Sequence, residues 1–343
     1  MDLLLILRGL AALSVVVWHT VGYQNELPSL LNIPGRTAVW LFFGLSGYVI
    51  AYGFFHKRYK LTTVDLKDFY INRFLRIYPL FLILSLISYV TSLIINGPPP
   101  IALGDLPAQL LAFQFNHTYV LSGVFWTLGI EIQFYVVAPL LVMPMLMASE
   151  KSLQTRLIVS YIFYIVMVSY VFYGVHSLGW SYDGRNLFAN LPHFFVGMAA
   201  CFITSKFKPS KIRFNISILS AFAILAYTNW LYSKAPGQYW TIRGLLKVDL
   251  MIFMFILAHA SLSRDRFKSN KLYIPFALLG TLSYGIYAWH AYLMKYLPEL
   301  SDKPFMLIVI SVGVAYLSYR FIESPALRLK REKNHSPIES VIK

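Results

Sequence analysis

The sequence predicts an all-α, polytopic membrane protein with about ten transmembrane helices, because of its composition and its recurring apolar runs. Hydrophobic residues make up 57% of the 343 residues and charged residues only 13%, whereas soluble domains carry roughly 25% charged residues. The mean hydropathy is +0.59. This composition excludes a disordered chain and an ordinary water-soluble globule. The single cysteine, Cys201, excludes an intramolecular disulfide.

Ten apolar runs of about 17 to 22 residues recur along the chain, and each is long enough to cross a bilayer as a helix. Backbone groups in lipid must be hydrogen-bonded within the protein, so a helix is expected for every run. The first run is expected to be a span and not a cleavable signal, since no basic region precedes it and Arg8 interrupts it. The predicted spans are residues 3–22, 37–55, 77–95, 127–147, 157–173, 187–204, 215–232, 245–262, 276–297 and 305–321.

The connections between these spans are mostly short. The exception is the segment 96–126, which begins with three prolines at 98–100. It is read either as a half-helix that lies in the membrane interface around Leu106–Leu111 or as an irregular loop. No internal repeat and no long linker divides the chain.

Lysine and arginine residues predict the orientation. Their excess, 30 against 15 acidic residues, indicates the membrane surface and not nucleic acid, because they lie between apolar runs. With a cytoplasmic N-terminus, 22 basic residues fall in inner segments, 7 fall at the outer side, and Arg8 is embedded. This is a strong positive-inside signal, and ten spans return the C-terminus to the cytoplasm.

Ionisable side chains inside predicted spans are functional candidates by default, because lipid makes them costly. Arg8 and His19 are eleven residues apart, which leaves them about 20° apart around a helix and ~16 Å apart along it. One helix face would therefore carry a guanidinium near the inner side and an imidazole near the outer side. An equally weighted alternative is that His19 hydrogen-bonds between helices. The other embedded candidates are Glu131 and His290, with His193 and Asp249 as weaker ones.

Glu131 lies at a depth similar to that of His19 in the predicted spans. A carboxylate there would orient or charge-balance an imidazole that acts as a general base. The alternative is a structural ion pair between Glu131 and Arg36 or Arg243.

Arg73 and Arg76 are three residues apart just before the third predicted span. On a helix this spacing places both on one face, where they would clamp phosphates, although ordinary positive-inside anchoring explains a lone pair as well.

HExxH, P-loop and Rossmann motifs are absent, and Ser46 lacks the spacing of a nucleophile elbow, so it is expected to be a packing residue. Binding of carbohydrate is a minority interpretation of Trp126, Tyr135 and Trp289.

At these segments the chain resembles the membrane-bound acyltransferase 3 family, which O-acylates carbohydrates and other extracytoplasmic acceptors. The matching stretches run in family order over nearly the whole chain. They are Arg8–Leu13 with His19, Phe42–Ile50, Arg73–Pro79, Trp126–Leu128 with Glu131, Phe134 and Tyr135, Ser283–Tyr287 with Trp289 and His290, and Glu323–Pro325.

The resemblance implies a transmembrane acyltransferase domain at 1–325, with a cytoplasmic polar tail at 326–343, in a bacterial inner membrane. In that family the Arg-x10-His pair and the RxxR pair are tied to activity. The chain ends about 20 residues after its last predicted span, so the C-terminal esterase-like domain of some relatives is not expected. Two departures are Thr127, in place of the more usual Ser, and Trp40, in place of an acidic residue, which makes acceptor identity less transferable.

The resulting hypothesis is an O-acyltransferase, with acetyl-CoA as the expected acyl-CoA donor and no metal. The donor phosphates would lie on Arg73 and Arg76 near Tyr78, and the pantetheine arm would pass Arg8. His19 would act as the base, with Glu131 as its partner, on a hydroxyl of a lipid-linked or exported carbohydrate such as O-antigen or exopolysaccharide. The expected acceptor-binding residues are Arg36, Trp126, Tyr135 and His290.

Several alternatives stay open at this point. Direct transfer and an acyl-histidine intermediate both fit. A transporter or flippase of lipid-linked sugars would use embedded His, Glu and Arg as a relay, but the paired broken helices that it predicts are not found. A non-catalytic carbohydrate-binding membrane protein would leave the arginine pair without a purpose. Besides membrane lipids, a homodimer partner is left open, and no nucleic acid is expected.

Overall fold

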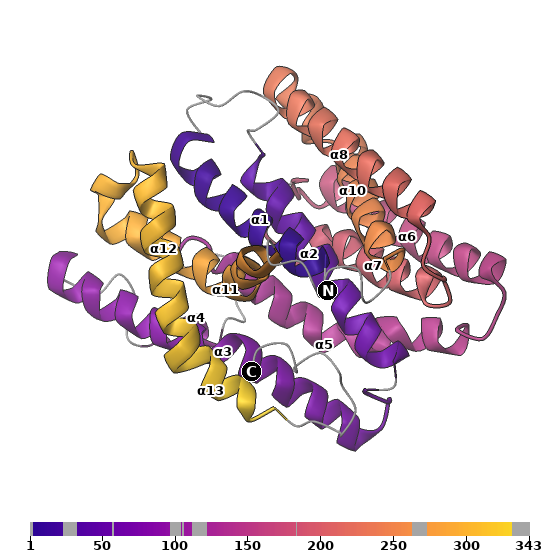
Figure 1. The fold of residues 1–343 in the computed structure, drawn as a ribbon, viewed down its shortest axis with the longest axis horizontal. Helices are drawn as coiled ribbons and strands as arrows, with labels where there is room; N and C mark the ends of the chain where they lie inside the picture. The colour runs from indigo at the N-terminus through magenta and orange to yellow at the C-terminus, as the bar shows by residue number, and fades with distance from the viewer. Residues whose placement is uncertain are drawn as a thin grey trace.

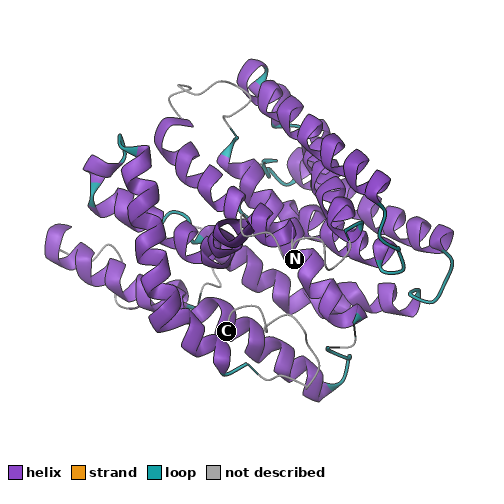
Figure 2. Ribbon diagram, in the orientation of Figure 1, coloured by secondary structure: helices purple, strands orange, loops and turns teal. Residues whose placement is uncertain are grey.

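The computed structural model describes residues 3–22, 33–56, 58–96, 104, 106–111, 122–182, 184–262 and 273–330. These residues form helices joined by short connections, and none of them lies in a strand (Figures 1 and 2). The all-α prediction is therefore confirmed for the part of the chain that the structure describes.

Each of the ten predicted spans coincides with a helix, in several cases a longer one than predicted. The helices are α1 (Leu3–Val17) with the π-helical turn η1 (Trp18–Gly22), α2 (Gly35–Phe55), α3 (Thr63–Asn96), α5 (Trp126–Met147), α6 (Leu153–Ser177), α7 (Leu187–Thr204), α8 (Lys211–Lys234), α10 (Ile242–Ala260), α11 (Tyr273–Tyr296) and α12 (Pro304–Ser318), which continues through η4 (Tyr319–Glu323) into α13 (Ser324–Arg328). Short helices are α4 (Leu106–Leu110), α9 (Pro236–Tyr239) and η3 (Pro298–Leu300).

Eight of the described helices are long and apolar enough to cross a membrane. The other two predicted spans are α10 and α11, which contain more polar residues. Helix α10 carries Arg243, Lys247 and Asp249, and α11 carries five tyrosines and His290. Neighbouring helices bury Asp249 and His290, since α10 contacts α7 and α8, and α11 contacts α1 and α12. Arg243, in the first turn of α10, is exposed.

Glycines allow the central helices to approach one another closely. A Cβ atom at Gly280 of α11 would overlap the backbone of Leu5 in α1, and one at Gly197 of α7 would overlap the backbone of Gly44 in α2. Small residues at such crossings are the usual means by which membrane helices pack. In Figure 1, α1, α2 and α11 occupy the centre of the bundle, while α8 and α10 lie side by side at one edge.

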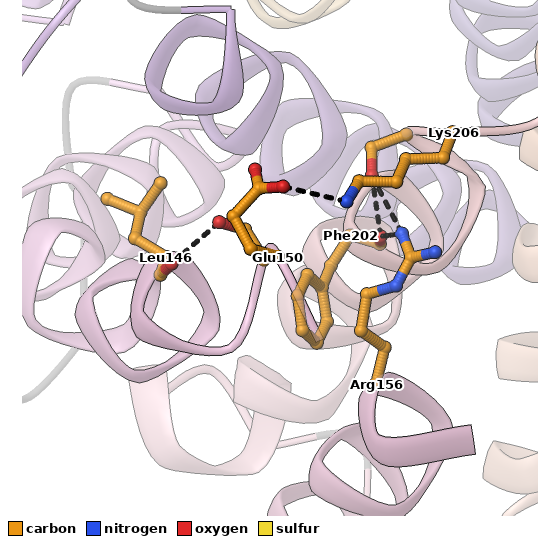
Figure 3. A network of polar contacts seen from close by, with 7 residues as sticks. Leu146, Glu150, Arg156, Phe202 and Lys206 are labelled. Carbon is orange, nitrogen blue, oxygen red and sulfur yellow. Dashed lines mark hydrogen bonds and ion pairs between the residues drawn. The ribbon is translucent and has the colours of Figure 1, made fainter. Parts of the chain in front are cut away.

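A polar contact ties α6 to the end of α7 (Figure 3). Arg156, which is 4% exposed, donates from Nη1 to the Phe202 carbonyl at 3.0 Å and to Ser205 Oγ at 3.0 Å. The last carbonyls of a helix have no partner within it, so this arginine satisfies one of them. The neighbouring Lys206–Glu150 ion pair, at 3.0 Å, is exposed and contributes little to stability.

The segment that was predicted to be a half-helix or a loop contains α4, a helix of five residues. Most of the remainder of 97–121 lies outside the described residues, as do residues 331–343 of the predicted tail. The longer start of α3 has a consequence for function. Because α3 begins at Thr63, Arg73 and Arg76 lie on a continuous helix, as the clamp hypothesis requires.

Candidate active site

A cavity of about 280 Å³ lies between α1, α2, α3, α5 and α11, and one residue each of η4 and α13 completes its wall. Its wall brings together five residues that the sequence analysis singled out for function: Arg8, Arg73, Arg76, Glu131 and Tyr135. They lie on three helices, α1, α3 and α5, which are far apart in the sequence and surround the same cavity in the fold. The cavity is the candidate binding site of this protein.

Arg73 and Arg76 reach the cavity from α3. Within the described residues, neither guanidinium forms an ion pair with a carboxylate. Arg73 instead lies near two aromatic rings, at 5.7 Å from the centroid of Phe69 and 5.7 Å from that of Tyr135, and its Nε is buried without a hydrogen-bond partner. Positive side chains that line a cavity without a protein carboxylate are suited to binding an anionic ligand.

Glu131 lies in the cavity wall on α5. Its Oε1 accepts hydrogen bonds from Ser46 Oγ at 2.7 Å and from the Tyr135 hydroxyl at 2.6 Å. Glu131 forms no hydrogen bond with His19, so the expected contact between these two is absent, and it does not pair with Arg36 or Arg243 either.

Ser46 was expected only to pack helices, and here it is part of the cavity wall. The single signal that could have indicated this is a hydroxyl in an apolar span. That signal is weak, since such hydroxyls usually bond to their own helix.

His19 pairs with a second histidine instead of with Glu131. Its Nδ1 lies 2.9 Å from the Val15 carbonyl and 3.3 Å from Nε2 of His290, and the two ring centroids are 5.2 Å apart. His290 is fully buried, and its own Nδ1 lies 3.3 Å from the Ile286 carbonyl. A carbonyl requires a donor, so this network assigns the proton of each neutral ring to Nδ1.

The pairing determines which nitrogen of His19 can act as a base. With the proton on Nδ1, the lone pair of His19 is on Nε2, and Nε2 of His290 accepts from the His19 Nδ1–H. The side chain beside His19 is therefore His290, where Glu131 was expected. His290 was expected among the acceptor-binding residues, and its pairing with His19 was not predicted.

The histidine pair lies beside the cavity and not on its wall. Tyr287 connects the two places: it lines the cavity, and its ring centroid is 5.7 Å from that of His290. Its hydroxyl is hydrogen-bonded to Thr127 Oγ1 at 3.1 Å, which holds the ring against α5.

Arg36 and Trp126 form a cation–π pair outside the cavity wall. The guanidinium of Arg36 lies 4.2 Å from the Trp126 ring centroid, and that of Arg185 lies 5.7 Å from the same ring. Tyr78 donates to the Leu111 carbonyl at 2.8 Å and also stays outside the cavity wall.

The weaker candidates His193 and Asp249 form a network of their own. His193 Nδ1 and Asp249 Oδ1 are 2.6 Å apart, and the Tyr164 hydroxyl donates to Asp249 Oδ2 at 2.6 Å. The ring of Trp40 stacks on His193 at 4.6 Å. None of these four residues lines the cavity. Among the described residues there is no group of three or more His, Cys, Asp and Glu side chains that could hold a metal ion.

Comparison with known proteins identifies the family. The family model described as "Acyltransferase domain" matches residues 4–320. A provisionally named O-acetyltransferase of Staphylococcus aureus strain COL is 25% identical over 363 aligned residues, which cover 93% of this chain and 56% of the relative. The O-acetyltransferase OatA of Staphylococcus aureus strain NCTC 8325 / PS 47 is 25% identical over 352 residues, with the same coverage.

The chain thus spans 56% of the length of these relatives. No solved structure matches it. The family match covers most of the chain, including α2, α3, α5 and α11, which line the cavity. This chain therefore belongs to the acyltransferase 3 family of multi-pass membrane acyltransferases.

Proposed function

We propose that this protein is a membrane O-acyltransferase that moves an acyl group, most simply acetyl, from acyl-CoA to a hydroxyl of a cell-surface or exported carbohydrate. The observation that carries the proposal is the cavity in which Arg8, Arg73 and Arg76 meet while Arg73 and Arg76 have no carboxylate partner among the described residues. A polyanionic donor supplies the missing negative charge. The names of the Staphylococcus aureus relatives support acetyl as the group transferred.

The proposed orientation follows from the basic residues. A cytoplasmic N-terminus in a bacterial inner membrane places most lysines and arginines inside. Arg73 and Arg76, near the start of α3, then face the cytoplasm, where acyl-CoA is present. Residues 1–325 would form the acyltransferase domain and 326–343 a cytoplasmic tail.

The donor would bind by its phosphates to Arg73 and Arg76. Guanidinium groups hold phosphate oxygens in bidentate fashion, which fixes both position and charge. The pantetheine arm would extend past Arg8 along the cavity toward Tyr287. Movement of Tyr287 would bring the thioester to His19, since this ring contacts both the cavity and the histidine pair.

His19 would act as the general base through Nε2. It takes the proton of the acceptor hydroxyl as that oxygen attacks the thioester carbon; the new C–O bond forms, the C–S bond breaks, and the leaving thiolate receives the proton from the imidazolium. His290 keeps the other proton of His19 on Nδ1. An acyl-histidine intermediate uses the same nitrogen as a nucleophile and remains compatible with this geometry.

The other predicted site residues fit around this path. Glu131 accepts hydrogen bonds from Ser46 and Tyr135. It is still proposed as an active-site carboxylate, but one that acts in the donor cavity and does not contact His19. Arg36 and Trp126, stacked together, are proposed to contact the acceptor carbohydrate, whose hydroxyls and rings suit an aromatic and cationic surface.

Transfer of label tests this function. Purified full-length protein in lipid nanodiscs is supplied with acetyl-CoA, labelled in the acetyl group, and with candidate glycans. The wild type is expected to transfer label. The kcat of His19→Ala is expected to fall by roughly 10²- to 10⁴-fold, which is the usual contribution of a general base. His176→Ala, at the exposed end of α6, is the matched control and should keep full activity. Full activity of a folded His19→Ala variant would contradict the assignment.

A further inference from the structure

Arg36 and Arg185 place two positive charges on one aromatic ring. The guanidinium carbon of Arg36 lies 4.2 Å from the centroid of the Trp126 ring, and that of Arg185 lies 5.7 Å from a ring centroid of the same residue. Each contact with the indole is favourable, but an aromatic ring does not neutralise a cation. Two like charges that share one ring repel each other, so the protein must hold both in place.

The segment that carries Arg185 is fixed by hydrogen bonds on both sides of this residue. Asn190 Nδ2 donates to the carbonyl of Gly184 at 2.7 Å and to that of Asn186 at 2.8 Å. These two residues come directly before and after Arg185. The side chain of Asn186 also caps the start of α7. The backbone of Arg185 is therefore held in position, while its side chain is exposed and accessible to a ligand.

The surroundings of the Trp126 ring add further positive charge. Arg36 and Trp126 lie in the first turns of α2 and α5, and Arg185 directly precedes the residue that caps α7. None of these three helices has an acidic residue in its first turn, although helix N-termini favour negative charge. Within the described part of the chain, Arg185 forms no ion pair. An anion from outside the protein would compensate this charge.

This group of residues lies at the end of the bundle that carries the proposed base. The residue before Arg36 is Gly35, and a Cβ atom added there would be 2.6 Å from Cδ1 of Trp18. Trp18 directly precedes His19 in η1. The start of α2, with Arg36, is thus packed against the turn that contains His19. A ligand held on Arg36 and Arg185 is therefore close to the site of transfer.

We infer that the acceptor is a negatively charged carbohydrate, and that Arg185, together with Arg36 and Trp126, binds its carboxylate or phosphate group. This inference rests on the proposed function, which assigns Arg36 and Trp126 to the acceptor without giving the acceptor a charge. Guanidinium groups bind carboxylate and phosphate oxygens in bidentate fashion, and the indole suits the face of a sugar ring. Anchoring the anionic group orients a hydroxyl of the acceptor toward His19. A neutral acceptor leaves the two repelling charges uncompensated, so charged acceptors are selected.

Transfer of label to charged and neutral oligosaccharides tests the inference. Oligosaccharides released from the envelope of the cells that produce the protein are separated by anion exchange into a charged and a neutral fraction. The full chain in lipid nanodiscs is supplied with each fraction and with acetyl-CoA labelled in the acetyl group. Label is expected in the charged fraction. Reduction of carboxylates to alcohols should abolish this labelling if the anion is a carboxylate, and removal of phosphate should abolish it if the anion is a phosphate.

The outcomes of this experiment separate the inference from the proposed function. Equal labelling of the two fractions, or labelling that survives both chemical treatments, would overturn the inference and leave the proposed function intact. If no fraction receives label, the proposed function fails and the inference fails with it.

Arg185→Ala then tests the residue itself, with the labelled oligosaccharide purified as the acceptor. Loss of a charge-assisted contact should raise the KM for this acceptor by roughly tenfold to a hundredfold, while the KM for acetyl-CoA stays the same. Arg185→Lys keeps the charge without the bidentate geometry and should recover part of the loss. Arg243→Ala, which removes an exposed arginine in the first turn of α10, is the matched control and should behave like the wild type. An unchanged acceptor KM in a folded Arg185→Ala variant would overturn the inference.

Discussion

Two groups of embedded charges in this protein differ in how they are satisfied. In the network of α6, α7 and α10, His193 pairs with Asp249 at 2.6 Å, and Tyr164 donates to the second carboxylate oxygen at 2.6 Å. In the cavity, Arg73 and Arg76 have no carboxylate partner among the residues described. In the first group the protein itself pairs both oxygens of the Asp249 carboxylate, and only His193 Nε2 is left without a hydrogen-bond partner; in the second group a ligand can pair the guanidinium groups.

The difference teaches how to separate structural from functional charges in a membrane. Both groups carry the same signal in the sequence, an ionisable side chain near an apolar run. A buried pair that satisfies itself mainly holds helices together, and breaking it costs stability. Guanidinium groups that open into a cavity add little to the fold and much to the binding of an anion.

The largest effect is expected from the cavity. Arg73→Ala combined with Arg76→Ala removes two charge-assisted contacts, each worth about 1.5–3 kcal/mol, so the KM for acetyl-CoA should rise by roughly 10² to 10⁴. Steady-state transfer of labelled acetyl measures it, with size-exclusion chromatography as the check on folding. The matched control is Arg320→Ala, because the Arg320 side chain is exposed and is not among the residues that line the cavity. An unchanged KM in the double variant would mean that the pair only anchors α3.

A loss of stability is expected from the paired network. Asp249→Asn leaves His193 without its buried counter-charge and should lower the free energy of unfolding by about 3 kcal/mol. Thermal unfolding of the purified protein measures this loss, while the KM for acetyl-CoA should stay the same. Tyr164→Phe removes one hydrogen bond and should cost only about 1 kcal/mol. A normal melting temperature together with a raised KM would place Asp249 in the donor site.

The helices of this fold could be predicted from the sequence because every apolar run must form one in lipid. The common position of Arg73 and Arg76 could also be predicted, because residues three apart on a helix lie on one face. Helix α3 contains both residues, and both line the cavity. The partner of His19 could not be predicted in this way. Depth alone placed Glu131 and His19 at the same level, but it carries no information on rotation about the helix axes or on which helices are neighbours.

Tertiary packing decided that point. Helix α1 packs against α11, so His19 meets His290, while Glu131 faces Ser46 of α2 and its own neighbour Tyr135. The π-helical turn η1 also affects the direction of the His19 side chain, because it contains this residue. No sequence pattern predicted the turn. Such a turn changes the direction of a side chain relative to a regular helix.

The smallest effect is expected from His290, which acts through His19. His290→Leu removes one of the two acceptors of the His19 Nδ1–H, and the Val15 carbonyl at 2.9 Å remains. The lost hydrogen bond is worth about 1 kcal/mol, so kcat should fall roughly fivefold while the KM for acetyl-CoA stays constant. His290→Gln offers an amide oxygen near the position of Nε2 and should restore most of kcat. A merely structural residue would not show this rescue at equal stability. Equal losses in the Leu and Gln variants, or a change confined to the KM of the acceptor, would return His290 to the acceptor-binding role that the sequence analysis gave it.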